Sequence, residues 1–186
     1  MTDLPTIFIL PGLGDSGPDH WQSVLERSDR RCVRIAQDEW DAPRCGAWVA
    51  RLDEAIARSE TPVVLVGHSS ACALVAHWTA SASREQIARV HGALLVAPSD
   101  PDGPNYPAGP TGFGPVPLSR LPFPSIVVAS DDDPYVTAAR ATEYAEAWGS
   151  EFVMLAGAGH INVASGFGPW PLGRDLLERL RAVAGR

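Results

Sequence analysis

Six short apolar runs recur along the chain, and each of them predicts a strand buried inside a sheet. The runs are apolar almost throughout instead of alternating with polar residues, which is typical of parallel strands that helices cover on both faces. They lie at residues 7–10, 33–36, 63–66, 93–97, 126–129 and 152–155.

Helical patterns separate these runs. Asp19 followed by Gln22 predicts a variant capping box at the start of the first helix. Apolar side chains recur at every fourth position from Trp48 to Ile56, which predicts an amphipathic helix, and Gly149 predicts a left-handed helix stop. The later predicted helices span residues 46–58, 70–80, 137–148 and 172–183.

The alternation of strand and helix predicts an α/β fold, with an open, mostly parallel, doubly wound sheet of about six strands and helices on both faces. A chain of 186 residues is expected to form a single domain spanning 1–186. Residues 98–124 interrupt the rhythm, because they hold nine of the 17 prolines. We expect a long, stiffened loop there, and its place after the carboxyl end of a strand favours a functional role.

Composition narrows the classes of partner and cofactor. The net charge of -7 leaves no basic stripe for nucleic acid or for an anionic membrane surface, so neither is an expected partner. The three cysteines are odd in number and form no C-x-x-C pair, which favours a reducing cytoplasm over a disulfide framework. The five histidines are scattered, so we predict no metal and no cofactor. Composition leaves the oligomeric state open.

The strongest chemical motif follows the run at 63–66, where Gly67-His68-Ser69-Ser70-Ala71 leads into a predicted helix. A strand, a sharp turn and a helix form the context of a nucleophile elbow, which exposes its serine at the end of the strand. Ala71 replaces the last glycine of the G-x-S-x-G pattern. The alternative is a polar turn in which Ser69 or Ser70 caps the helix. We interpret His68 as structural or pocket-lining.

A serine nucleophile needs a histidine base and an acid, which in α/β-hydrolases follow in the order Ser, Asp, His. His160 directly follows the predicted strand at 152–155, and its alternative is a surface-loop histidine. The acid comes from the triplet 131–133. We predict Asp133, since it lies furthest beyond the strand and can curl back toward the histidine, and Asp132 stays the alternative.

The oxyanion of a tetrahedral intermediate needs two hydrogen-bond donors. We predict the backbone N–H of Ser70, after the nucleophile, and that of Leu13, in the glycine-rich stretch 11–17 after the first strand. Such a stretch could instead cradle phosphate, but it has neither a Walker lysine nor G-x-G-x-x-G spacing.

Several motifs together resemble the small serine hydrolases related to human retinoblastoma-binding protein 9. They lie at residues 11–14, 17–23, 67–70, 133–136, 157–162 and 168–171. The resemblance implies a compact α/β-hydrolase fold without a lid domain, with Ser69, Asp133 and His160 on the catalytic positions. It implies no particular substrate.

The expected function is therefore hydrolysis of small esters through an acyl-serine intermediate, with amides and thioesters as further substrates. The expected partner is a small-molecule acyl substrate. Acyl transfer to an acceptor other than water is a variant of the same chemistry. The alternative from another class is a non-catalytic protein-interaction module that retains the hydrolase fold.

Overall fold

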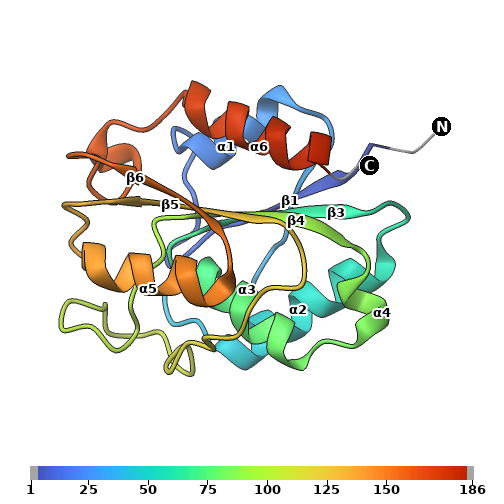
Figure 1. The fold of residues 1–186 in the computed structure, drawn as a ribbon, viewed down its shortest axis with the longest axis horizontal. Coiled ribbons are helices and arrows are strands. Elements are labelled where there is room, and N and C mark those ends of the chain that lie inside the picture. The colour runs from blue at the N-terminus through green and yellow to red at the C-terminus, as the bar shows by residue number, and fades with distance from the viewer. Residues whose placement is uncertain (1–3, 184–186) are drawn as a thin grey trace.

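A computed structural model describes residues 4–183 and contains one six-stranded sheet in which every strand pair is parallel. The strand order is β2-β1-β3-β4-β5-β6 (Figure 1). This arrangement confirms the predicted doubly wound sheet. The strands are β1 (Thr6–Leu10), β2 (Cys32–Arg34), β3 (Val63–His68), β4 (Val90–Val96), β5 (Ser125–Ser130) and β6 (Glu151–Leu155).

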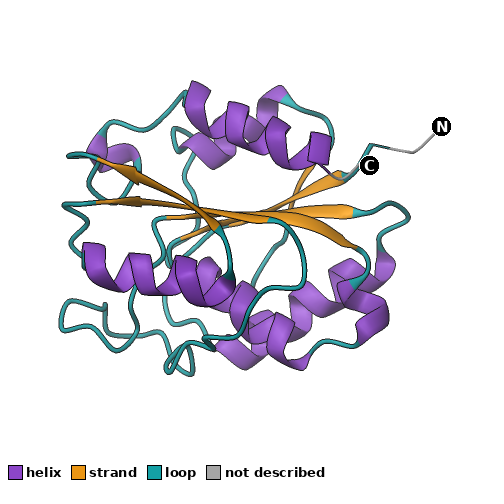
Figure 2. Ribbon diagram, in the orientation of Figure 1, coloured by secondary structure: helices purple, strands orange, loops and turns teal. Residues whose placement is uncertain are grey.

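Helices cover both faces of the sheet, as Figure 2 shows most plainly. One face carries α1 (Trp21–Ser28) and α6 (Pro171–Val183), and the other carries α2 (Cys45–Arg58), α3 (Ser70–Ser81) and α5 (Ala138–Trp148). Two short elements were not predicted, α4 (Arg84–Ile87) and the 3-10 turn η1 (Val163–Ser165). None of the helices in the described part is long and apolar enough to cross a membrane.

The sheet separates two hydrophobic cores, which explains why the central strands contain continuous apolar runs. In β3, Val63 and Leu65 belong to the core under α2, α3 and α5, whereas Val64 and Val66 belong to the core under α1 and α6. All four side chains are fully buried. Burying an aliphatic side chain is worth about 1.5–3 kcal/mol, so a polar residue on either face would destabilise the sheet.

Local details differ from the prediction at the edges of the fold. Helix α1 is capped by His20, not Asp19, because the His20 Nδ1 atom accepts the Gln22 N–H at 3.2 Å. Strand β2 is shorter than the predicted run 33–36. It forms one edge of the sheet and β6 forms the other, and both edge strands are partly exposed. The predicted stop at Gly149 is confirmed, with φ of 68°.

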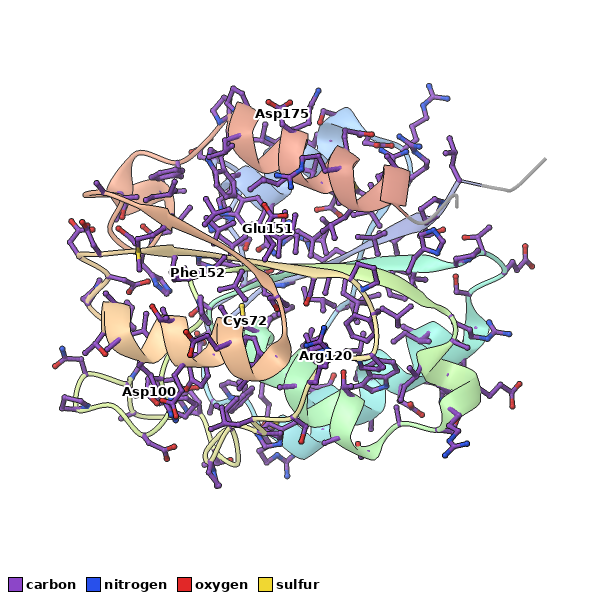
Figure 3. All side chains as sticks on the ribbon, in the orientation of Figure 1. Cys72, Asp100, Arg120, Glu151, Phe152 and Asp175 are labelled. Atoms are coloured by element: carbon purple, nitrogen blue, oxygen red, sulfur yellow. The ribbon has the colours of Figure 1, made fainter. Side chains whose placement is uncertain are left out.

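The proline-rich segment, residues 98–124, contains no helix or strand apart from one bridge between Arg44 and Thr111. It is nevertheless fixed to the body. Phe113 is buried in the core with α2 and α3, and Trp148 Nε1 donates to Pro117 O at 2.9 Å. Figure 3 labels Asp100 beside α5, where the Tyr144 hydroxyl donates to it at 3.1 Å. The segment therefore packs against the helices of the domain and does not form a separate lid.

Candidate active site

The site lies at the carboxyl ends of the strands, on the left in Figure 1. Strand order reverses between β1 and β3, because β2 lies outside β1 while β4 follows β3. Open parallel sheets bind ligands at such a switch point. The loops after these two strands carry the predicted oxyanion donors and the predicted nucleophile.

Ser69 occupies the sharp turn between β3 and α3 with φ 59° and ψ −125°, a conformation that non-glycine residues rarely adopt. Its amide is held by Val96 O at 3.0 Å. Although Ser69 stands at the cap position, its side chain makes no capping hydrogen bond. The strained turn therefore serves to project the hydroxyl rather than to cap the helix.

Gly12 lets the β1 loop, residues 11–17, approach this serine. A Cβ atom at Gly12 would lie 2.8 Å from Ser69 Cβ and 2.9 Å from His68 O, closer than real Cβ contacts. The absence of a side chain at Gly12 thus sets the distance between the β1 loop and the turn at Ser69.

The two predicted oxyanion donors meet at this approach. Leu13 and Ser70 both line the cavity that contains Ser69, and neither amide donates a backbone hydrogen bond within the described residues. Arg34 fixes the adjoining part of the loop, since its Nη1 atom donates to Asp15 Oδ1 at 2.6 Å and to Ser16 O at 2.9 Å. One N–H group on the braced β1 loop and one at the start of α3 would suit a developing negative charge.

Asp133 and His160 form a buried pair. His160 Nδ1 lies 2.8 Å from Asp133 Oδ2 and 3.0 Å from Oδ1, and the Asp133 side chain is fully buried. A carboxylate accepting from Nδ1 favours the tautomer in which Nε2 carries a lone pair. His160 is thus arranged to accept a proton at Nε2.

The neighbouring acids hold the backbone around the histidine. We call residues 130–133 the acid turn and residues 157–160 the histidine loop. Side chains of the acid turn accept the N–H groups of the three residues that precede His160 in the histidine loop. Gly157 N donates to Asp131 Oδ1 at 2.8 Å, Ala158 N to Ser130 Oγ at 2.9 Å and Gly159 N to Asp132 Oδ1 at 2.7 Å. The hydrogen bonds from Ser130 and from Gly159 N–H lower the pKa of Asp132. The structure therefore brings Asp133, not Asp132, to the imidazole.

Two further histidines line the cavity. His68 Nε2 donates to His160 O at 2.9 Å, and the His68 ring centroid lies 4.8 Å from that of His20 and 4.9 Å from that of His160. Burial lowers the pKa of His68 well below its usual value, and burial with the nearby Arg34 lowers the pKa of His20 to about 4. Both rings are therefore neutral near pH 7. The prediction that His68 is structural or pocket-lining agrees with this position.

The cavity around Ser69 has a volume of about 190 Å³. Besides the residues already named, it is lined by Asp15, Ser99, Pro107, Tyr135 and Asn162. Ser69 Oγ has one hydrogen-bond partner among the described residues, the Ser99 hydroxyl at 2.8 Å, and none is formed with His160. Ser99 and His20 were both missed at the sequence level. In the described residues no three His, Cys, Asp or Glu side chains gather as metal ligands would.

Comparison with known proteins extends this picture. A YdeN-like hydrolase from Pectobacterium atrosepticum is 33% identical with a TM-score of 0.85, and the match covers 96% of this chain and 91% of that one. The ydeN gene product of B. subtilis is 17% identical, with a TM-score of 0.71 and 96% and 99% of the two chains covered. Est1E from Butyrivibrio proteoclasticus, solved with ferulic acid, is 11% identical, with a TM-score of 0.67 and coverage of 96% and 90%. The last two likenesses show the fold alone.

None of the curated proteins matches this chain. The serine hydrolase family matches residues 7–179, which is almost the whole sequence. Together with the similarity to the YdeN-like hydrolase over nearly the full chain, this match shows that the protein belongs to the serine hydrolase family.

Proposed function

We propose that the protein hydrolyses small esters through an acyl-Ser69 intermediate, with His160 as general base and Asp133 as the residue that orients it. The observation that carries the proposal is the buried contact of 2.8 Å between His160 Nδ1 and Asp133 Oδ2, at the cavity that holds Ser69 on its strained turn. A serine hydroxyl alone is a weak nucleophile at neutral pH, so a neighbouring oriented imidazole is what its activation requires.

In this reaction the Ser69 hydroxyl turns to His160 and attacks the ester carbonyl while its proton passes to Nε2. The carbonyl electron pair moves onto oxygen, and the Leu13 and Ser70 amides stabilise the negative charge. Collapse breaks the bond to the alcohol, which takes the proton from His160. Water then repeats the sequence on the acyl-serine and releases the acid.

The size of the cavity supports a short acyl group. A volume of about 190 Å³ is below the roughly 300–1,000 Å³ of sites that enclose drug-sized ligands. The walls offer many polar groups, and the proline-rich segment contributes only Ser99 and Pro107 to them. Amides and thioesters remain alternative substrates, because the same machinery attacks any activated carbonyl. The relation to the family of retinoblastoma-binding protein 9 likewise remains a prediction.

The proposal is tested with p-nitrophenyl esters of increasing chain length and with a fluorophosphonate probe. We expect wild type to hydrolyse acetyl and butyryl esters faster than long-chain esters and to react with the probe at Ser69. Ser69→Ala should lose both turnover and labelling. Ser81→Ala, at the far exposed end of the same helix, is the matched control and should retain both.

Labelling that survives in Ser69→Ala would assign the nucleophile elsewhere. Failure of wild type to turn over any ester, amide or thioester would favour the alternative, a non-catalytic interaction module. The specific observation behind that alternative is the Ser69 hydroxyl bonded to Ser99 instead of His160.

A further inference from the structure

Ser99 holds a position that the catalytic scheme does not use. It follows β4 by three residues, and β4 pairs with β3 in a register that places Val96 beside His68. The Ser99 hydroxyl therefore reaches the nucleophile, with 2.8 Å between the two Oγ atoms. Ser99 is only 3% exposed and lines the same cavity as Ser69.

The chain reaches this position through an unfavourable turn. Ala97, immediately after β4, has φ of 49°, and its amide is held by Val128 O at 2.8 Å. A positive φ at a residue with a Cβ costs on the order of 1–3 kcal/mol and persists only where surrounding structure enforces it. Pro98 then fixes the next φ. Two strained turns, at Ser69 and at Ala97, thus present the two hydroxyls to each other.

The hydrogen-bond capacity of a hydroxyl limits what Ser69 can do in this state. Its single proton must be donated to His160 Nε2 before attack, yet Ser69 Oγ is bonded to Ser99 and not to His160. Ser99 Oγ also has no other hydrogen-bond partner within the described residues. Each hydroxyl therefore has the other as its hydrogen-bond partner in a buried place where a hydroxyl without any partner would be costly.

We propose that Ser99 is a positioning residue that latches the Ser69 hydroxyl away from His160 in the free enzyme. In the latched state that we propose, the Ser69 hydroxyl donates to Ser99 Oγ. Attack then requires this hydrogen bond to break and the Ser69 proton to turn to His160 Nε2, while Ser99 itself is chemically unchanged. The latch stabilises the ground state and not the transition state, so it slows acylation. This inference rests on the proposed role of Ser69.

The test compares Ser99→Ala with wild type in the second-order rate of fluorophosphonate labelling, in which Ser69 Oγ attacks phosphorus and fluoride leaves. We expect the rate to rise about 2- to 10-fold, the range given by the net worth of one neutral hydrogen bond. Ser99→Thr, which restores a hydroxyl, should return the rate toward wild type. The ratio of Ser99→Ala to wild type should stay constant from pH 6 to 9, because neither hydroxyl titrates there.

A merely structural role would give a different pattern, with a slower rate or a displaced pH profile. An unchanged or reduced rate in folded Ser99→Ala overturns the latch. If Ser99→Ala does not fold, Ser99→Cys supplies the test, since the weaker thiol hydrogen bond predicts a smaller rise and no rise refutes the proposal. Labelling that persists in Ser69→Ala would instead refute the proposed nucleophile, so the two failures are distinguishable.

Discussion

The two halves of the site differ in how fully their polar groups are bonded. On the base side, the acid turn accepts an N–H from each of Gly157, Ala158 and Gly159, and Asp133 accepts from His160 Nδ1. On the nucleophile side, within residues 4–183, the Leu13 and Ser70 amides donate no backbone hydrogen bond and the Ser69 hydroxyl has Ser99 as its one partner. The base side is thus complete before substrate arrives.

This contrast indicates where reorganisation must occur. Buried polar groups are normally paired, so free donors at a cavity mark the places where a ligand supplies the missing partner. In the proposed reaction, a rigidly held base fixes the direction of the proton transfer, whereas the substrate carbonyl would complete the hydrogen bonding on the nucleophile side.

The largest expected effect lies on the base side. Asp133→Asn should preserve the fold but lower kcat about 10⁴-fold, because the amide no longer holds His160 in its working tautomer, as in serine proteases. Asp131→Asn and Asp132→Asn serve as matched controls, since both side chains face backbone amides. Measuring kcat on one ester for all three variants compares them directly. A greater loss at Asp132 than at Asp133 would reassign the acid.

On the nucleophile side, Gly12→Ala should lower kcat about 100-fold, the cost expected when an oxyanion donor is displaced. The new Cβ would lie 2.8 Å from Ser69 Cβ, so the β1 loop must retreat. Gly17→Ala, in the same loop with nothing within 4 Å, is the control. Equal kcat values for the two variants would show that the β1 loop does not serve the reaction.

The neutral histidines make stability depend on pH. Burial lowers the pKa of His20 from its ordinary value of 6.5 to about 4 in the folded protein, so between these values the unfolded chain binds a proton that the folded chain does not. The free energy of unfolding therefore rises with pH through this window. The lowered pKa of His20 alone accounts for a rise of about 2 kcal/mol between pH 5 and pH 7. His68 acts in the same direction.

Denaturant unfolding of wild type and His20→Gln at pH 5 and pH 7 measures this effect. The variant should show a smaller difference in unfolding free energy between the two pH values. An equal or larger difference in His20→Gln would mean that His20 is not held neutral by the fold.

The smallest expected effect tests the bracing of the histidine loop. Asp132→Ala removes the acceptor for Gly159 N–H and should lower kcat about 10-fold through a displaced imidazole, with KM little changed. Asp19→Ala, an exposed acid that does not cap α1, should leave kcat unchanged. If both variants match wild type, the backbone contacts of the acid turn do not position His160.

The sequence predicted the sheet well because buried parallel strands require continuous apolar runs, and six of those runs correspond to the six strands. The sequence predicted short elements and the ends of helices less accurately. Helix α4 has only four residues and no apolar periodicity. The cap of α1 was assigned to Asp19, although an imidazole Nδ1 can accept the same N–H as a carboxylate.

The site could be predicted only where local pattern and chemistry coincide. Ser69 was identifiable because a strand, a turn and a helix surround it, but the choice between Asp132 and Asp133 depends on how the acid turn curls against the histidine loop. Ser99 was not identifiable, since its approach to Ser69 depends on the pairing of β3 with β4 and on the left-handed turn at Ala97.

The central claim is that Ser69 carries the acyl group during turnover. The most direct measurement is mass spectrometry of the protein quenched during hydrolysis of a short-chain p-nitrophenyl ester, followed by peptide mapping, with Ser69→Ala in parallel. We predict one acyl adduct per chain on the Ser69 side chain, which disappears as the ester is exhausted and never forms in the variant. An adduct on another residue that turns over at the catalytic rate, or one that persists in Ser69→Ala, would contradict the claim.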